Sequence, residues 1–198
     1  MLGSADAQFC TACGTPLVGQ VVDHRTRRVC PACGQIHWQN AKPCAGALVI
    51  RNGKVLLIRR IIEPFKGYWD IPGGFCEVDE HPAETAVREV WEETGLEIEL
   101  TGLLGLWLDE YVARPTLNIY YLARPLIRHL RIGDDAGAAA WFAPDALPQK
   151  IAFVNGRMAL EAWASGDSTP VHWRGTERDG VAGPQAVIDN CGLSQAGL

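Results

Sequence analysis

The chain has 198 residues, of which 47% are hydrophobic and 21% charged, and its net charge is −5. This composition is typical of one folded domain with a small appendage, and it excludes wholesale disorder. The longest apolar runs are too short to cross a bilayer, and the N-terminus has no basic segment followed by an apolar one. We therefore expect a cytoplasmic protein that does not enter membranes and has no overall basic field for nucleic acid.

Four of the seven cysteines form two C-x-x-C pairs separated by 16 residues, and a glycine follows each pair. Two such pairs at this spacing predict a tetrahedral zinc site, with Cys10, Cys13, Cys30 and Cys33 as its ligands. A segment this short buries too little apolar surface to fold unaided, so the zinc is predicted to be structural. We assign residues 1–40 to a zinc ribbon. The alternative is one redox-active pair beside an incidental one.

A small basic cluster lies between the two cysteine pairs, formed by His24, Arg25, Arg27 and Arg28. Such a cluster is most simply a solvated hairpin tip. It is also a possible contact for nucleic acid or another partner, and this alternative stays open for the ribbon.

The pattern changes after the ribbon to strands and then to a helix. An Asn52-Gly53 turn between two apolar runs predicts a β-hairpin, and a Pro- and Gly-rich loop follows it. Pro82 predicts the start of a helix that Gly95 ends. The spacing of its apolar residues predicts that one face packs on a sheet, with Ala83, Ala86, Val87, Val90 and Trp91 on that face.

The rest of the chain continues the mixed pattern. Residues 96–112 and 116–127 predict strands, and residues 151–166 predict a second amphipathic helix. Strands before and between only two helices favour an α/β sandwich with a mixed sheet. Residues 166–198 are polar and Gly-rich, and we expect a loosely ordered tail that docks, if at all, through Trp173 and the Val187-Ile188 pair.

Negative charge is concentrated in one short stretch, because seven acidic residues fall within Gly73–Leu96. On the predicted helix, Glu89, Glu92 and Glu93 are spaced i, i+3, i+4 and share one face. Carboxylates grouped in this way suit hard divalent cations, which take oxygen ligands. The alternative is an ordinary exposed acidic face.

The same stretch resembles the signature of the Nudix hydrolase family, G-x5-E-x7-R-E-U-x-E-E-x-G-U, where U is a bulky apolar residue. Gly74 opens the pattern, Glu80 follows after five residues and Arg88-Glu89 after seven more, and Leu96 closes it. The resemblance covers about 41–165, which we assign to a Nudix domain. It implies the Nudix α/β/α sandwich, preceded here by the small zinc-ribbon module.

The resemblance also implies a site and its chemistry. Members of the family hydrolyse a nucleoside diphosphate linked to another moiety with Mg²⁺ or Mn²⁺. It places the metal on Glu89, Glu92 and Glu93, with a backbone carbonyl at Gly73 and Glu80 as a further ligand. Arg88 orients a carboxylate, and the helix glutamates Glu92 and Glu93 are the expected catalytic residues.

The general base is the least defined part of the expected site. Many family members have a glutamate three residues ahead of the position of Trp141, where this chain has Ala138. Candidates for the base are therefore Glu93, Glu110, Asp134 and Asp135.

Substrate contacts are expected from residues outside the signature. Arg59 and Arg60 precede the glycine loop and are candidates for binding phosphate. Tyr111, Tyr120 and Phe153 are candidates for stacking on a base or flavin ring. Each aromatic has a core role as its alternative.

The substrate class follows from segments flanking the signature. His37–Asn40 and the Arg59–Trp69 stretch, RRIIEPFKGYW, are similar to ribbon-bearing ADP-ribose and FAD pyrophosphatases. NADH and NAD-cap pyrophosphatases carry S-Q-P-W-P-F-P-x-S after the signature, and this chain has no such motif there. Further alternatives are nucleoside triphosphate hydrolysis and a non-catalytic nucleotide- or nucleic-acid-binding regulator. A homodimer is possible.

Overall fold

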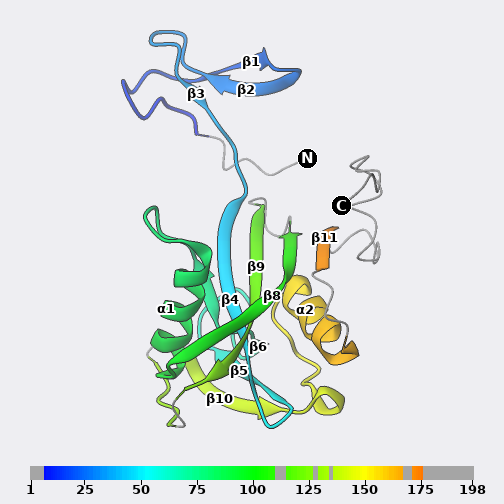
Figure 1. Cartoon of the computed structure of the whole chain (residues 1–198). Coiled ribbons are helices and arrows are strands. Elements are labelled where there is room, and N and C mark those ends of the chain that lie inside the picture. Colours follow the sequence, from blue (N-terminus) through cyan, green and yellow to red (C-terminus); the bar gives the residue numbers. More distant parts are fainter. Residues whose placement is uncertain (1–6, 110–114, 127–128, 134–135, 167–170, 176–198) are drawn as a thin grey trace.

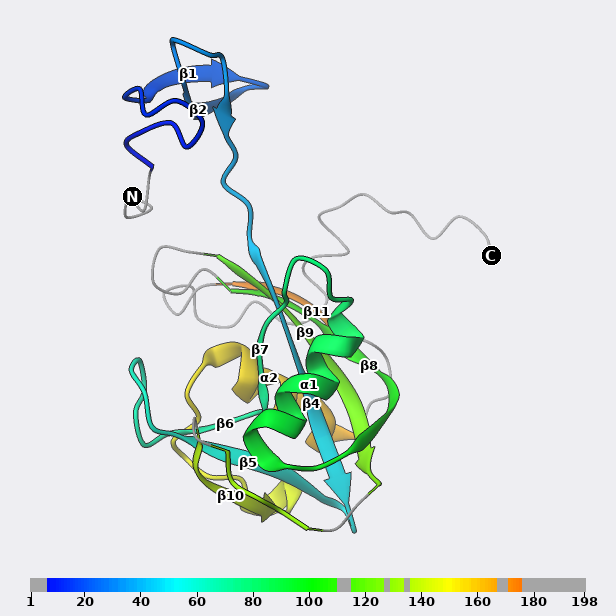
Figure 2. The same ribbon diagram turned by 90° about the vertical axis from the view of Figure 1, so that its left-hand side faces the viewer.

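The computed structural model describes residues 7–109, 115–126, 129–133, 136–166 and 171–175. These residues form a small N-terminal three-stranded sheet and a larger sandwich (Figure 1). In the first two views the small sheet stands apart from the sandwich, joined to it by the extended residues that lead into β4 (Figure 2).

The small sheet is built from β1 (Val18–Val22), β2 (Arg25–Val29) and β3 (Ile36–His37) in antiparallel order. Asp23 and His24 both have positive φ, as a two-residue turn of this kind requires. At the base of the sheet, Gly14 and Gly34 each donate their N–H to the carbonyl of the first cysteine of the preceding pair, at 2.9 Å in both cases. Residues 24–28, predicted to lie at a hairpin tip, fall in the β1–β2 turn and in β2.

The sandwich is organised around an eight-stranded mixed sheet. Its main path is β10-β5-β4-β9-β8-β11, while β6 pairs with β5 and β7 with β4. The β4–β9 and β8–β11 pairs are parallel and the others are antiparallel. The elements are β4 (Lys42–Arg51), β5 (Lys54–Arg60), β6 (Trp69–Asp70), β7 (Gly73–Phe75), α1 (Pro82–Thr94), β8 (Ile98–Asp109), β9 (Thr116–Pro125), β10 (Ala136–Phe142), the 3-10 turn η2 (Pro144–Ala146), α2 (Val154–Ser165) and β11 (Val171–Gly175).

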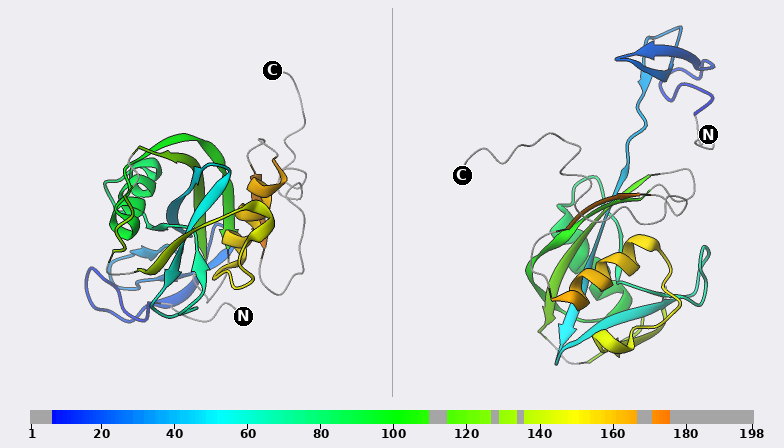
Figure 3. Two further views of the ribbon diagram at one scale, coloured as in Figure 1. Left: turned by 90° about the horizontal axis from the view of Figure 1, so that it is seen from below. Right: turned by 90° about the vertical axis from the view of Figure 1, so that its right-hand side faces the viewer.

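The central strand β4 is buried on both faces, which explains its continuous apolar run. Ala47 and Val49 pack with Ala86 and Val90 of α1. Leu48, between them in sequence, packs on the other face with α2. The two helices therefore cover opposite faces of the sheet, as Figures 2 and 3 show from the two sides. The predicted α/β/α sandwich with a mixed sheet is confirmed.

Helix α1 begins and ends as predicted, at Pro82 and at a left-handed Gly95 cap, but its buried face differs from the prediction. Val87 and Trp91 are exposed, at 37% and 49%, so the prediction that they pack on the sheet is wrong. The fully buried side chains of α1 are Thr85, Ala86, Val90 and Thr94. This rotation of the helix turns Glu89 and Glu93 partly inward.

Two glycines allow the paired strands β4 and β7 to approach each other closely just before α1. A Cβ on Gly46 would lie 2.6 Å from the Pro72 carbonyl oxygen, and a Cβ on Gly73 would lie 2.7 Å from the Ala45 carbonyl oxygen. Neither contact is tolerable for a real side chain. The turn at Gly73-Gly74 is therefore held against β4 by backbone contacts alone.

We expect Gly46→Ala to lower the free energy of unfolding by about 1–3 kcal/mol, because the new methyl group meets backbone rather than a flexible side chain. Denaturant unfolding measures this. Gly102→Ala in β8 is the matched control, since a Cβ there has open space around it. Equal stability of the two variants would contradict the close approach of β4 and β7.

The predicted tail begins with an ordered strand. β11 pairs in parallel with Gly105–Asp109 of β8, at the edge of the sheet. Residues 167–170 and 176–198 of the tail, with Val187 and Ile188 among them, lie outside the described residues. Neither helix in the described part of the chain has the length and apolar character that spanning a membrane requires.

Candidate active site and zinc centre

The end of α1 meets the glycine turn through Glu93. The Gly73 N–H donates to Glu93 Oε2 at 3.0 Å, which joins the helix to the segment that leads into it. Glu89, one helical turn earlier, lies directly against the next glycine. A Cβ on Gly74 would be 2.4 Å from Glu89 Oε1. The Gly-Gly sequence thus provides the space that these two carboxylates occupy.

Arg88 is the centre of a network of charged groups on α1 and in the segment just before it. Its Nε and Nη2 donate to both oxygens of Glu80, at 2.6 and 2.9 Å. Its Nη1 donates to Glu89 at 2.7 Å and to Glu92 at 3.0 Å, and Nη2 also donates to the Phe75 carbonyl oxygen at 3.2 Å. One guanidinium group therefore fixes three carboxylates and the strand before the helix.

The carboxylates fall into two electrostatic classes. Hydrogen bonds from Arg88 lower the pKa of Glu80 to about 2, so Glu80 is a permanent anion. Burial raises the pKa of Glu93 to about 8, and burial also raises the pKa of Glu89 despite its contact with Arg88. Burial costs a carboxylate its hydration, and a cation at the site would offset that cost. Glu89 and Glu93 are therefore the carboxylates that gain most from a bound cation.

The donor set fits a hard divalent cation. Its members are carboxylate oxygens, and the Gly73-Gly74 turn brings backbone beside them. Among the described residues, no three carboxylates bring their oxygen atoms within 4.8 Å of one another. In that part of the chain, the four cysteine sulfurs are the one group of possible metal ligands that lies so close together. Arg88 instead forms ion pairs with Glu80, Glu89 and Glu92. A cation would thus bind to groups that Arg88 holds in place.

A cavity of about 630 Å³ opens beside this turn. Glu93, Gly73 and Gly74 line it, together with Arg60, and its wall continues over β4, β9 and the first turn of α2. This volume is in the range of small-molecule sites in proteins. The wall includes two of the aromatic residues predicted to stack on a base or flavin ring, Tyr120 and Phe153.

The two predicted phosphate-binding arginines lie in different places. Arg60 lines the cavity, where Nε donates to the Pro64 carbonyl oxygen at 3.0 Å and Nη1 donates to Asp70 at 3.2 Å. Its guanidinium group also lies 5.0 Å from the centre of the Phe153 ring. Arg59 is exposed, donates to the Gly67 carbonyl oxygen at 3.0 Å, and is not part of the cavity wall.

Asp70 is the main charged residue of the site that the sequence reasoning missed. It is 7% exposed, accepts from Ile71 N–H at 2.9 Å and from Arg60, and lines the cavity. Burial raises the pKa of this carboxyl to about 6. The signal in the sequence was a single acid within the otherwise apolar YWDIP run before the glycine turn.

Three further polar residues of the cavity wall were also missed, and each is buried: Asp109, Asn118 and Asn155. Asn118 interrupts the apolar run of β9, and this interruption was the available signal. Asn155 lies in the first turn of α2, next to Gly156. Asn is common near helix starts, so the sequence gives no sign that this residue lines a cavity.

Several sequence candidates lie outside the described residues, namely Glu110, Tyr111, Asp134 and Asp135. Ala138, at the position where a glutamate is expected, pairs with Arg59 across β10 and β5. Like Arg59, it is not part of the cavity wall.

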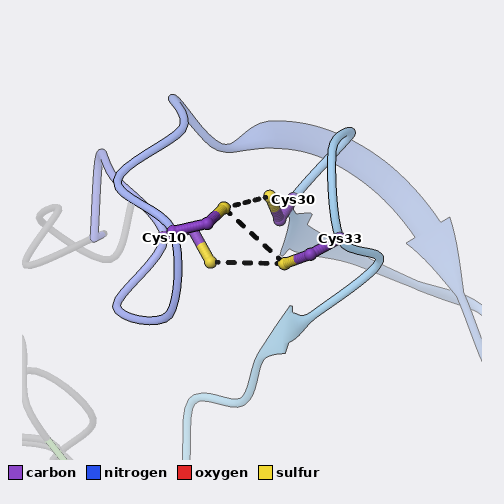
Figure 4. Close-up of side chains that lie close together, drawn as sticks. Cys10, Cys30 and Cys33 are labelled. Atoms are coloured by element: carbon purple, nitrogen blue, oxygen red, sulfur yellow. Dashed lines mark hydrogen bonds between the residues drawn. The ribbon is translucent and has the colours of Figure 1, made fainter.

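The four cysteines of the ribbon converge, with all four sulfur atoms within 4.8 Å of one another. Cys13 lies 3.5 Å from Cys30 and 3.7 Å from Cys33, and Cys10 lies 3.6 Å from Cys33 (Figure 4). Tetrahedral zinc with bonds of about 2.3 Å places its sulfurs roughly 3.8 Å apart. The cluster fits a zinc ion.

The buried Glu93 carboxyl predicts a pH dependence of stability in the zinc-loaded protein without added Mg²⁺ or Mn²⁺. Its pKa is near 4.5 when unfolded and about 8 when folded, so between these values the folded state holds a proton that the unfolded state has lost. We therefore expect the Glu93 contribution to the free energy of unfolding to fall as pH rises from about 4.5 to about 8. Denaturant unfolding at a series of pH values measures this slope.

Glu93→Gln removes this titration, so its slope should be shallower than that of the wild type. Glu97→Gln, which changes an exposed glutamate three residues beyond α1, should keep the wild-type slope. Identical slopes for all three proteins would contradict the assignment.

Comparison with known proteins accounts for both parts of the chain. The family model for the NUDIX domain matches residues 41–162, and the model described as Nudix N-terminal, a zinc ribbon, matches residues 8–39. An ADP-ribose pyrophosphatase of Methanocaldococcus jannaschii is 38% identical over 108 residues, 54% of this chain and 63% of that protein. The NAD-capped RNA hydrolase NudC of Chromobacterium violaceum is 31% identical over 148 residues, 71% of this chain and 52% of that protein. The chain thus spans less than two thirds of either relative.

Solved structures agree with the family assignment. A NUDIX hydrolase from Nitrosomonas europaea superposes with a TM-score of 0.77 at 26% identity, covering 86% of this chain and all of that one. A MutT NUDIX hydrolase from Burkholderia pseudomallei is 32% identical with a TM-score of 0.58, covering 63% of this chain and 98% of that one. The chain therefore belongs to the Nudix hydrolase family, with a Nudix N-terminal zinc-ribbon domain ahead of its Nudix domain.

Proposed function

We propose that this protein is a divalent-metal-dependent pyrophosphohydrolase that acts on an adenine nucleoside diphosphate linked to another moiety, with ADP-ribose or FAD as its substrate. The observation that carries this proposal is the junction of α1 with the Gly73-Gly74 turn. Two partly buried carboxylates, Glu89 and Glu93, meet this turn beside a cavity large enough for a nucleotide.

Glu89, Glu92 and Glu93 hold Mg²⁺ or Mn²⁺ in this proposal, with the Gly73 carbonyl and Glu80 as further oxygen donors. A bound divalent cation neutralises pyrophosphate oxygens and lowers the pKa of the attacking water. Arg88 is the positioning residue, because it binds Glu80, Glu89 and Glu92 at once. Glu80 keeps Arg88 in place and stays ionised over the physiological pH range.

The chain's own residues also bind and orient the substrate. Arg60 presents a cation in the cavity, while its contacts with Pro64 and Asp70 fix its direction. It is therefore the better candidate of the two arginines for binding a phosphate. Glu92 is about half exposed, whereas Glu93 is partly buried at the cavity, so Glu93 is the better placed of the two to accept a proton from water.

The substrate class is supported by the flanking sequence and by one relative. The RRIIEPFKGYW segment places Arg60 and Pro64 at the cavity. The Methanocaldococcus relative is named an ADP-ribose pyrophosphatase. An NADH or NAD-cap substrate is the second candidate, favoured by the NudC relative, but the S-Q-P-W-P-F-P-x-S segment expected of that group is absent after Leu96.

The ribbon is proposed to carry one structural zinc on Cys10, Cys13, Cys30 and Cys33. Its role is to fold the ribbon, whose described part buries few apolar residues, namely Cys10, Leu17, Val29 and Cys30.

Incubation of the full chain with ADP-ribose, FAD, NADH and ATP in Mg²⁺ or Mn²⁺ tests the proposed function. We expect AMP from ADP-ribose or FAD at a kcat/KM at least about tenfold above those for NADH and ATP. The highest value on NADH would move the assignment to the second candidate. Release of nothing from any of the four would refute hydrolysis.

A further inference from the structure

Two buried amides line the same cavity as Glu93. Asn118 of β9 is 8% exposed and Asn155 of α2 is 3% exposed. Buried amide groups in native proteins normally have hydrogen-bond partners on both sides. Here half of each amide has no partner among the described residues, and both unpaired halves belong to residues of the cavity wall.

Two backbone carbonyl oxygens favour one orientation of the Asn118 amide, whereas the Thr116 hydroxyl can pair with either half of it. Asn118 Nδ2 donates to Thr116 Oγ1 at 3.0 Å and approaches the carbonyl oxygens of Trp107 and Thr116 at 3.4 and 3.5 Å. A flipped amide would set its oxygen against two carbonyl oxygens, which is repulsive. Asn118 therefore offers the cavity an acceptor, Oδ1.

Asn155 is fixed in the opposite sense. Its Oδ1 accepts from the Gly156 N–H at 2.7 Å, within the first turn of α2. A flipped amide would set N–H against N–H and leave this helix donor unpaired. Asn155 therefore offers the cavity a donor, Nδ2. The wall thus presents one fixed donor and one fixed acceptor from two different elements.

We propose that this pair reads the edge of the adenine ring of the substrate. Asn155 Nδ2 donates to ring N1, and Asn118 Oδ1 accepts from the exocyclic amino group. This inference rests on the proposed function, and adenine is the part that ADP-ribose and FAD share. Neighbouring Phe153 and Tyr120 supply an aromatic wall, and Arg60 adds a cation for the phosphates in the same cavity.

The fixed amides make a sharp prediction about the base. Hypoxanthine has a ring N–H in place of the adenine N1 acceptor and a carbonyl in place of the amino group. Donor then meets donor and acceptor meets acceptor, and turning either amide would lose a hydrogen bond to a backbone atom. Sites built on buried hydrogen bonds reject such mismatches strongly. We expect the hypoxanthine analogue of ADP-ribose to bind about 100-fold more weakly.

Calorimetric titration of the zinc-loaded full chain with ADP-ribose and with its hypoxanthine analogue, IDP-ribose, tests this without added Mg²⁺ or Mn²⁺, so that turnover does not consume the ligand. The wild type alone is informative, because a preference of about 100-fold for ADP-ribose supports the reading. Equal affinities, or no binding of either ligand, would overturn it.

Asn155→Asp sharpens the test, because an aspartate still accepts from Gly156 but replaces the free donor by an acceptor. We expect it to lose the preference for adenine. A buried carboxylate also costs stability, so thermal unfolding is measured alongside to show that the variant is folded. Asn52→Asp, in the exposed hairpin turn, is the matched control and should keep the preference. An unchanged preference in Asn155→Asp would also overturn the reading.

The titration also separates this inference from the proposed function. If the protein bound ADP-ribose selectively but hydrolysed no substrate in Mg²⁺, the proposed hydrolase activity would be refuted. The proposed recognition of adenine by the two amides would still stand. A protein that hydrolyses both ligands equally well and binds both equally would do the reverse.

Discussion

Glu93→Gln is expected to lower kcat for ADP-ribose hydrolysis by about 10²–10³-fold, the loss typical of removing one charged group aimed at a reaction. The glutamine keeps an oxygen that can accept from the Gly73 N–H, so the turn should stay in place. The substitution removes the negative charge that a divalent cation needs as a ligand. Burial makes this charge costly when no cation is bound. Steady-state rates at saturating Mg²⁺ measure the effect, and Glu92→Gln is expected to behave similarly.

Glu97→Gln is the matched control, since this glutamate is exposed and lies outside the cavity wall. It should retain the wild-type kcat. Thermal unfolding of each variant separates a loss of chemistry from a loss of fold. If Glu93→Gln kept full activity and its fold, Glu93 would be neither a metal ligand nor a catalytic residue.

Cys30→Ser is expected to abolish zinc binding and to unfold the ribbon while the sandwich stays folded. Cys30 is 1% exposed in a cluster with only two other buried apolar residues, so no core remains to support the ribbon. Structural zinc contributes roughly 10–16 kcal/mol to the folding of comparable small domains. Elemental analysis should change from one zinc per chain to none.

Trypsin provides a readout of ribbon folding, because Arg25, Arg27 and Arg28 all lie in the paired strand β2. Cleavage at these positions should be slow in the wild type and fast in Cys30→Ser. Cys44→Ser is the control, since Cys44 lies on β4 outside the cluster and should leave zinc content and cleavage unchanged. Equal zinc content in Cys30→Ser and the wild type would contradict the four-cysteine site.

The sequence predicts the parts of the fold that local chemistry determines. Asn52-Gly53 turns the β4–β5 hairpin with positive φ at both residues, and Gly95 ends α1 in the left-handed conformation, as predicted. The spacing of the cysteine pairs likewise predicts their convergence. In each case a few neighbouring residues carry the information.

The orientation of α1 is not local, and there the prediction fails. Hydrophobicity alone places Val87 and Trp91 against the sheet, yet both are exposed. The helix is instead turned so that Arg88 reaches Glu80 and Phe75, and Glu93 reaches Gly73. Ion pairs and a glycine turn upstream of the helix thus fix its rotation, and hydrophobic periodicity does not contain these contacts.

Sequence patterns also fail to predict much of the cavity wall. Asp70, Asn118 and Asn155 come from β6, β9 and α2, and only the crossing of these elements brings them to one cavity. Each looks like an isolated polar residue in its own segment. Their roles depend on which atoms the backbone leaves unpaired, and that is a property of the folded chain.

The central claim is that the carboxylates on α1 and the glycine turn support hydrolysis of a pyrophosphate bond. Phosphorus NMR of ADP-ribose incubated with the full chain and Mg²⁺ tests this most directly, because it identifies which bond is cut. We expect the two pyrophosphate signals to be replaced by those of AMP and ribose 5-phosphate, and we expect Glu93→Gln to slow this change by about 10²–10³-fold. An unchanged pyrophosphate spectrum with the wild type, or the same rate with Glu93→Gln, would contradict this claim.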